Sequence, residues 1–156
     1  MMRRLQRSGR WVQQCGFTLI EILVALLVFA FGVLGLVGLQ ASAISFSTDA
    51  QQRADATFMA DQLLGRMLIS DPATAATFAH RPTGTTICAP TGAASTNAVV
   101  TEWLAELARV LPNAASTDQQ VVVDATTGQV TVRLCWRNGQ NGTPHQLVVS
   151  NQVQWQ

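Results

Sequence analysis

A single acid lies inside the longest apolar segment of this chain. Glu21 is the only charged residue between Arg10 and Asp49, and the segment from Phe17 to Leu39 is otherwise mostly apolar. At about 1.5 Å per residue this segment forms a helix roughly 34 Å long, enough to cross a hydrocarbon core of about 30 Å. A carboxylate in such a segment is costly and usually functional, so we expect it to become protonated or to pair with a cation.

The residues before Glu21 indicate a source for that cation. The run from Gly16 to Glu21 is Gly-Phe-Thr-Leu-Ile-Glu, and four arginines precede it: Arg3, Arg4, Arg7 and Arg10. This run resembles the processing site of type IV prepilins, and the resemblance implies a cut after Gly16 that creates a free amine on Phe17, four residues before the acid. The amine of the same chain, or the better placed amine of a neighbouring subunit, would then neutralise Glu21 and set the register between two helices.

Three other interpretations of this N-terminus remain open. A secretory signal is supported by the small-x-small run at residues 41–43, but the apolar stretch is about 23 residues long, whereas a signal core has about 7 to 15. A plain single-pass anchor explains the length and leaves the six-residue run as a coincidence. Glu21 as a tolerated acid near the headgroups is the third interpretation, and we favour processing over all of them.

The charge distribution changes once residues 1–16 are set apart. The chain has ten arginines, no lysine and nine acids, and loss of the four upstream arginines leaves six against nine, a side-chain charge of −3. A basic segment before an apolar one places the N-terminus in the cytoplasm and the remainder outside. No basic stripe is left that predicts phosphate contacts, so we do not expect nucleic-acid binding.

Two cysteines remain after Gly16. Cys15 falls in the leader, and Cys88 and Cys135 lie in the exported part, where two cysteines usually pair. The loop that they close has about 48 residues, which is worth on the order of 4 kcal/mol in the chain-entropy model. Two buried free thiols are the alternative.

The pattern predicts one long helix from residue 17 to about residue 70, because no proline precedes Pro72. Its outer half has a core-facing stripe with three- and four-residue spacing: Ala56, Met59, Ala60, Leu63, Leu64 and Met67. The polar residues Gln51, Asp55, Gln62 and Arg66 are predicted on the opposite, solvent-facing side. Glycines recur at positions 32, 35 and 38, which indicates a flexible stretch, a close-packing face or no specific role.

Residues 71–97 have no clear period and predict an irregular connection. Asn97 is a predicted cap of a second helix that extends to about Leu111, with an apolar face of Val100, Trp103, Leu104, Leu107 and Leu111. Alternating apolar residues then predict three strands, at 120–125, 129–136 and 145–155. The simplest arrangement is a three-stranded meander packed on the long helix, an α+β fold.

The remaining polar and aromatic residues predict no catalytic chemistry. Trp103, Trp136 and Trp155 are expected to be core residues. His80 and His145 lie in loop-like sequence without the spacing of metal ligands, and we expect both on the surface. Glu102 and Glu106 share one helix face and are predicted to be solvated. We therefore expect no enzyme activity, no metal and no cofactor.

The stretch from Gly16 to Gln40 resembles the type IV pilin superfamily. Together with the helix from Trp103 to Pro112 and the strand ending near Trp136, it resembles the minor pilins called type IV pilus modification protein PilV. Major pilins usually have a helix-bending proline in the outer part of the membrane-spanning segment. They also often have a disulfide loop near the C-terminus. This chain has no proline between Phe17 and Ser70 and has Cys88 far upstream, which favours a minor pilin.

The resemblance implies a pilin-like fold and a set of processing residues. Gly16 and Phe17 flank the peptidase cut, Phe17 is N-methylated, and Glu21 guides assembly. The expected organisation is a leader at 1–16, a membrane-spanning or filament-core helix half at 17–40, and a head domain at 41–156 that includes the amphipathic helix half at 41–70.

The resemblance also implies partners and a location. The expected partners are a prepilin peptidase and methyltransferase, the inner membrane, other minor pilins and a major pilin, and a tip adhesin. The protein is expected in the inner membrane with a periplasmic head, and in a surface pilus after assembly, where it primes assembly as a low-abundance subunit. A pseudopilin of a type II secretion system is the near alternative, and a pilus module that binds DNA or surfaces is the distant one.

Overall fold

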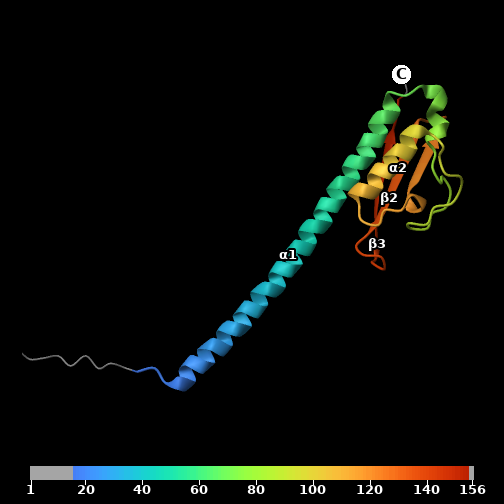
Figure 1. The fold of residues 1–156 in the computed structure, drawn as a ribbon. Helices are drawn as coiled ribbons and strands as arrows, with labels where there is room; N and C mark the ends of the chain where they lie inside the picture. Colours follow the sequence, from blue (N-terminus) through green and yellow to red (C-terminus); the bar gives the residue numbers. More distant parts are fainter. Residues whose placement is uncertain (1–15, 155–156) are drawn as a thin grey trace, which may run out of the picture. The chain divides into compact units, whose positions relative to one another are not determined.

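The structure is a computed structural model that describes residues 16–154 of the chain. Two compact units divide the chain after Ser45, and helix α1 runs from one into the other. Residues 1–15, which belong to the predicted leader and include Cys15, lie outside the described residues, as does the predicted core residue Trp155. Figure 1 shows the elements in chain order: α1 (Leu19–Leu68), η1 (Pro72–Phe78), α2 (Ala98–Val110), η2 (Ser116–Asp118), β1 (Gln120–Asp124), β2 (Gln129–Arg137) and β3 (Pro144–Gln152).

The core of the outer unit (residues 46–154) lies between two helices and a sheet. The six residues predicted as the stripe of the long helix are all buried, and so are the five predicted on the second helix. Asn97 caps α2 as predicted, because its side chain accepts a bond from the Val99 backbone N–H. The two helices are joined at the centre of the core by Trp103, whose indole Nε1 donates to the Met59 carbonyl at 2.8 Å. In Figure 1, α2 lies alongside the outer part of α1.

The sheet is the predicted antiparallel meander, in the order β1-β2-β3. Because side chains alternate between faces, the register places one set of residues on the helix side: Val121, Val123, Val130, Val132, Leu134 and Trp136. All of them belong to or pack against the buried core. The α+β prediction is therefore confirmed. β3 ends at Gln152, three residues before the predicted end, although Val153 beyond it is buried.

The predicted solvent-facing side of α1 is partly wrong. Asp55, Gln62 and Arg66 are half-buried at the margin of the buried stripe. The Arg66 guanidinium lies 3.5 Å from the Glu106 carboxylate of α2, so Glu106 is also not simply solvated. These three side chains are partly covered because α2 packs beside α1. The periodicity of one helix does not show which neighbouring helix will cover its edges.

The connection at 71–97 is more ordered than predicted. Asp71 accepts a bond from the Ala73 backbone N–H and begins the 3-10 helix η1. His80, which the sequence placed on the surface, is buried at 3% exposure. Its Nδ1 accepts from the Ser95 N–H at 3.1 Å, so Nε2 is the donor to the Ser116 carbonyl at 2.9 Å. This histidine can be buried because both of its ring nitrogens are hydrogen-bonded to backbone groups. His145 is half-buried and stacks on Trp136.

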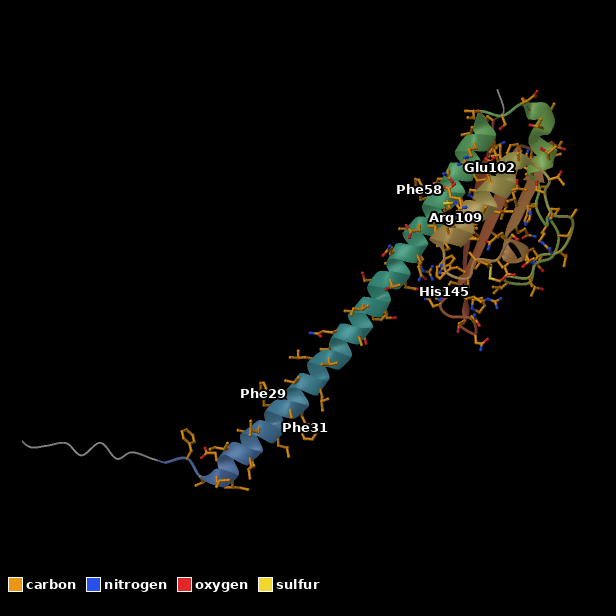
Figure 2. The ribbon with its side chains drawn as sticks, in the orientation of Figure 1. Phe29, Phe31, Phe58, Glu102, Arg109 and His145 are labelled. Atoms are coloured by element: carbon orange, nitrogen blue, oxygen red, sulfur yellow. A yellow bond between two sulfur atoms is a disulfide. The ribbon has the colours of Figure 1, made fainter. Side chains whose placement is uncertain are left out.

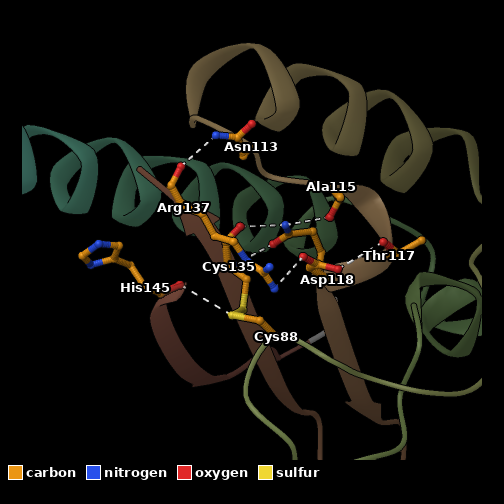
Figure 3. Close-up of polar contacts among 9 residues, drawn as sticks. Cys88, Asn113, Ala115, Thr117, Asp118, Cys135, Arg137 and His145 are labelled. Carbon is orange, nitrogen blue, oxygen red and sulfur yellow. Dashed lines mark hydrogen bonds and ion pairs between the residues drawn. A yellow bond between two sulfur atoms is a disulfide. The ribbon is translucent and has the colours of Figure 1, made fainter. Parts of the chain in front are cut away.

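The second face of the sheet is crossed by the segment that carries Cys88. Figure 3 shows the predicted disulfide between Cys88 and Cys135 of β2. Cys88 Sγ also lies 3.7 Å from the His145 carbonyl oxygen. This is a contact without a hydrogen bond, because a disulfide sulfur has no hydrogen to donate. Gln120 ties the same segment to β1, since its amide nitrogen donates to the Arg81 and Thr83 carbonyls.

A side chain takes the place of a strand where β2 extends past β1. The Gln119 amide accepts from the Cys135 backbone N–H at 2.8 Å and donates to the Cys135 carbonyl at 2.9 Å. It also donates to the Ala115 carbonyl at 2.9 Å, and the residue is 0% exposed. The buried backbone groups of Cys135 are therefore satisfied as they would be by a neighbouring strand.

The turn between β1 and β2 is organised by one carboxylate. The Thr127 hydroxyl donates to Asp124 at 2.8 Å, and the Thr126 and Thr127 backbone N–H groups donate at 2.9 and 3.3 Å. These bonds, that of the Thr127 hydroxyl first, hold the pKa of Asp124 below its ordinary value of 3.8. The ionised form is favoured in the folded state because only that form accepts all three bonds.

Replacing Gln119 by leucine is expected to lower the free energy of unfolding by about 2 to 6 kcal/mol. Two buried backbone groups of Cys135 would lose their partners, at about 1 to 3 kcal/mol each. The measurement is urea unfolding of the full chain in detergent micelles, followed by tryptophan fluorescence. The matched control is Gln51→Leu at an exposed position of α1. Equal losses in the two variants would contradict the role of Gln119.

Thr127→Val is expected to raise the pKa of Asp124 toward 3.8, since it removes the strongest of the bonds that lower it. Because the folded-state pKa lies below the unfolded-state value, the stabilisation is complete above pH 3.8. It disappears as the pH falls through the folded-state pKa. Carboxyl NMR titration measures the midpoint directly. Thr126→Val, which keeps its backbone N–H, is the control and should shift the midpoint less.

Candidate processing and assembly site

The run from Gly16 to Thr18 precedes the first turn of α1. The helix begins at Leu19, and the Thr18 carbonyl accepts the backbone N–H groups of Glu21 at 3.1 Å and Ile22 at 3.4 Å. Phe17 is 78% exposed. A Cβ added at Gly16 would meet nothing within 4 Å, so this glycine is not required by crowding in the chain itself. The bond between Gly16 and Phe17 thus lies in an accessible, non-helical segment.

Glu21 lies in the first turn of α1, where the helix dipole favours a negative charge. It borders a shallow apolar surface lined by Phe17, Ile22, Ala25, Leu26 and Phe29. Within residues 16–154 its carboxylate makes no hydrogen bond or ion pair. The described chain therefore contains nothing that neutralises this acid.

The helix around this acid is apolar on every side. The large apolar side chains from Leu19 to Leu39 are all exposed, and Figure 2 shows Phe29 and Phe31 projecting from the helix. A helix that is apolar all round needs lipid or other helices around it. Among the described residues, α1 is the one helix that is long and apolar enough to cross a membrane.

Three glycines interrupt this apolar surface without interrupting the helix. The structure is helical through Gly32, Gly35 and Gly38, and a Cβ at each would meet nothing within 4 Å. The helix is therefore intact in this chain by itself. The flexible-stretch and close-packing interpretations both remain predictions, because each concerns a lipid or neighbour environment.

The N-terminal segment matches a known family model. Residues 11–37 match the model described as the prokaryotic N-terminal methylation motif. A search of curated proteins and a search of solved structures each found no match. The match covers the N-terminal segment alone.

The motif indicates a type IV pilin-like protein, either a pilin or a pseudopilin. It is the substrate site of the prepilin peptidase. Motif and fold together indicate a structural protein. With the long apolar helix, they fit a protein that is anchored in the inner membrane and becomes associated with a pilus.

The residues singled out from the sequence fall into two places. Gly16, Phe17 and Glu21 lie together at the start of α1, while Cys88 and Cys135 form their disulfide in the outer unit. No group of three or more His, Cys, Asp or Glu residues in the described part of the chain is arranged to hold a metal ion. Sequence reasoning missed Gln119 and His80. The one available signal was a polar pair, Gln119 and Gln120, directly before a run of valines.

Val28→Arg is expected to reduce retention of the chain in membranes after carbonate extraction. Val28 is at the middle of the apolar segment 17–39, where an arginine costs about 2.5 to 3.5 kcal/mol on insertion scales. Ser47→Arg, beyond that segment, is the control and should stay in the membrane like the unmodified chain. Equal retention of both variants would contradict the membrane assignment.

Proposed function

We propose that this chain is synthesised as a prepilin, cut between Gly16 and Phe17, and methylated on the new Phe17 amine. Cleavage removes residues 1–16 as a leader and leaves a helix half at 17–40 and a head domain at 41–156, with its amphipathic helix half at 41–70. Two observations support this proposal. The family match spans the cut site, and Gly16–Thr18 lie outside the helix.

The single observation that carries the proposal is the Glu21 carboxylate, which has no partner among residues 16–154 and lies in the apolar part of α1 before Gln40. An isolated charge in lipid costs a few kcal/mol, which an opposite charge in contact offsets. Cleavage after Gly16 creates a suitable cation at Phe17. In an assembly the Phe17 amine of a neighbouring subunit would pair with Glu21. This one ion pair would favour addition of the subunit and would also set its axial register.

Within this class we infer a minor pilin of the kind called type IV pilus modification protein PilV. The absence of a proline between Phe17 and Ser70 and the upstream position of Cys88 favour a minor over a major subunit. In this role the protein primes pilus assembly and enters the filament at low abundance. Its partners would be the prepilin peptidase and methyltransferase, other minor pilins, the major pilin and a tip adhesin.

The first test is mass spectrometry of the N-terminal peptide from sheared surface filaments and from membranes. A peptide that begins at methylated Phe17 and occurs in the filament fraction is the expected result. A processed peptide restricted to membranes would favour a pseudopilin of a type II secretion system. A peptide that begins at Ile44 would contradict the proposal, because it marks an ordinary secreted domain.

Glu21→Val is expected to be cut and methylated but to be depleted from filaments. Loss of an ion pair worth only 1.4 kcal/mol lowers the equilibrium constant for subunit incorporation about tenfold. We therefore expect at least tenfold less of the variant in filaments, relative to its membrane pool. The matched control, Ile22→Val, keeps the acid and should enter filaments normally. Unchanged incorporation of Glu21→Val would show that the carboxylate does not guide assembly.

A further inference from the structure

The outer strand of the sheet has a free edge whose backbone directions can be derived. Val153 donates its N–H to the Gly128 carbonyl at 2.8 Å, so Val153 faces β2. In an antiparallel pair, the backbone N–H and C=O groups of successive residues point alternately toward the partner strand and away from it. The β3 residues Gln146, Val148 and Ser150 therefore direct both N–H and C=O away from β2. The opposite strand agrees, because Cys135 and Arg137, paired with Gln146 and Pro144, use their N–H groups away from β3.

These outward backbone groups have no partner among residues 16–154, whereas several outward groups at the opposite margin of the sheet do have partners. On β1, Val121 exchanges both backbone bonds with His80, at 3.0 and 2.9 Å. On β2, the Gln119 amide satisfies Cys135. Beyond it, Pro112 and the Asn113 side chain satisfy Arg137. In the described part of the chain, the edge of β3 is thus the longest run of outward strand groups for which no partner is found.

The side chains of β3 do not protect this edge. Exposed edges are usually blocked by charged residues, an internal proline or a bulge. β3 has no Asp, Glu, Lys or Arg, and its one proline is the first residue, Pro144. The paired register is continuous over nine residues, and Val148 is 49% exposed. The free stretch ends at Gln152, whose N–H is taken by the Asn151 side chain at 2.8 Å.

An unpaired arginine lies one strand inward from this edge. Arg133 of β2 is directly opposite Val148, on the sheet face away from the helices. Its Nε is buried without a hydrogen-bond partner, and no ion pair within the described residues includes it. A strand added beside β3 would lie about 9.6 Å from β2, two strand spacings. An arginine and an acidic side chain together span that distance across a valine.

We propose that the free edge of β3 binds an extended segment of another protein, which adds a fourth strand and carries an Asp or Glu opposite Val148. Main-chain bonds to Gln146, Val148 and Ser150 supply the binding, and the acid that pairs with Arg133 supplies the selectivity. A second copy of this strand does not fit that requirement, because β3 contains no acid. This proposal goes beyond the function proposed above and does not depend on N-terminal processing.

The test uses the full chain in detergent micelles and a synthetic heptapeptide, acetyl-Thr-Val-Thr-Glu-Thr-Val-Thr-amide. NMR amide hydrogen exchange reports each residue of β3. At saturating peptide we expect exchange at Gln146, Val148 and Ser150 to slow at least about tenfold. The same peptide with Gln in place of Glu should bind about two- to fivefold more weakly, the range for an opposite-charge cross-strand pair. Arg133→Gln should abolish that difference.

Two controls separate edge binding from a change in fold. Val148→Pro removes an outward N–H without removing a bond to β2 and should abolish binding, whereas Val148→Thr keeps the N–H and should preserve it. The second control leaves the protein unchanged. A peptide whose backbone nitrogens are methylated at the alternate residues that face β3 cannot donate N–H hydrogen bonds to the β3 carbonyls. It should therefore not slow hydrogen exchange at the β3 amides.

Three outcomes would overturn the proposal. The first is unchanged exchange at the three β3 amides with every peptide. The second is equal binding of the Glu and Gln peptides, which would remove the acidic selectivity. The third is protection that rises with protein concentration in the absence of peptide, which would assign the edge to a second copy of the chain. All three readouts concern β3 alone, so they are separate from the fate of the leader.

Discussion

Burial of one face of α1 holds the outer unit together. Six small or flexible apolar residues of that face are covered by α2 and the sheet, and the indole of Trp103 ties the helices by donating to a carbonyl of α1. The remaining elements depend on this packing, because a three-stranded sheet needs a helix against its apolar face for stability. The disulfide then fastens the segment around Cys88 to the opposite face of the sheet.

The same helix meets two environments along its length. In the outer unit, α1 has a buried stripe and an exposed polar side, as a surface helix of a globular domain does. Before Ser45 it is apolar on all sides and carries one acid, an arrangement that water does not favour. One continuous helix thus links two different parts. The outer unit buries its own apolar side chains, whereas the N-terminal part needs lipid or other helices to cover its apolar surface. That contrast is the physical basis for a protein that is first anchored and then assembled.

Satisfaction of backbone hydrogen bonds accounts for several residues that carry no chemistry of their own. His80 pairs with Val121 at the edge of β1, and Gln119 takes the place of a neighbouring strand beside Cys135. Both are buried polar residues whose bonds are complete, as buried polar groups require. Against this background the edge of β3 and Arg133, both without partners among residues 16–154, are the features that a further chain would complete.

The sequence alone determined the two α-helices, the three strands, their meander and the pairing of Cys88 with Cys135. Periodicity, a capping Asn97 and the cysteine count are local or compositional signals. It also supplied Gly16, Phe17 and Glu21, whose proposed roles depend on their order along the chain. Only the tertiary structure decided that His80 is buried, that Arg66 pairs with Glu106, and that β3 keeps a free edge. These outcomes depend on which groups are brought together from distant segments, and a linear pattern contains no record of that proximity.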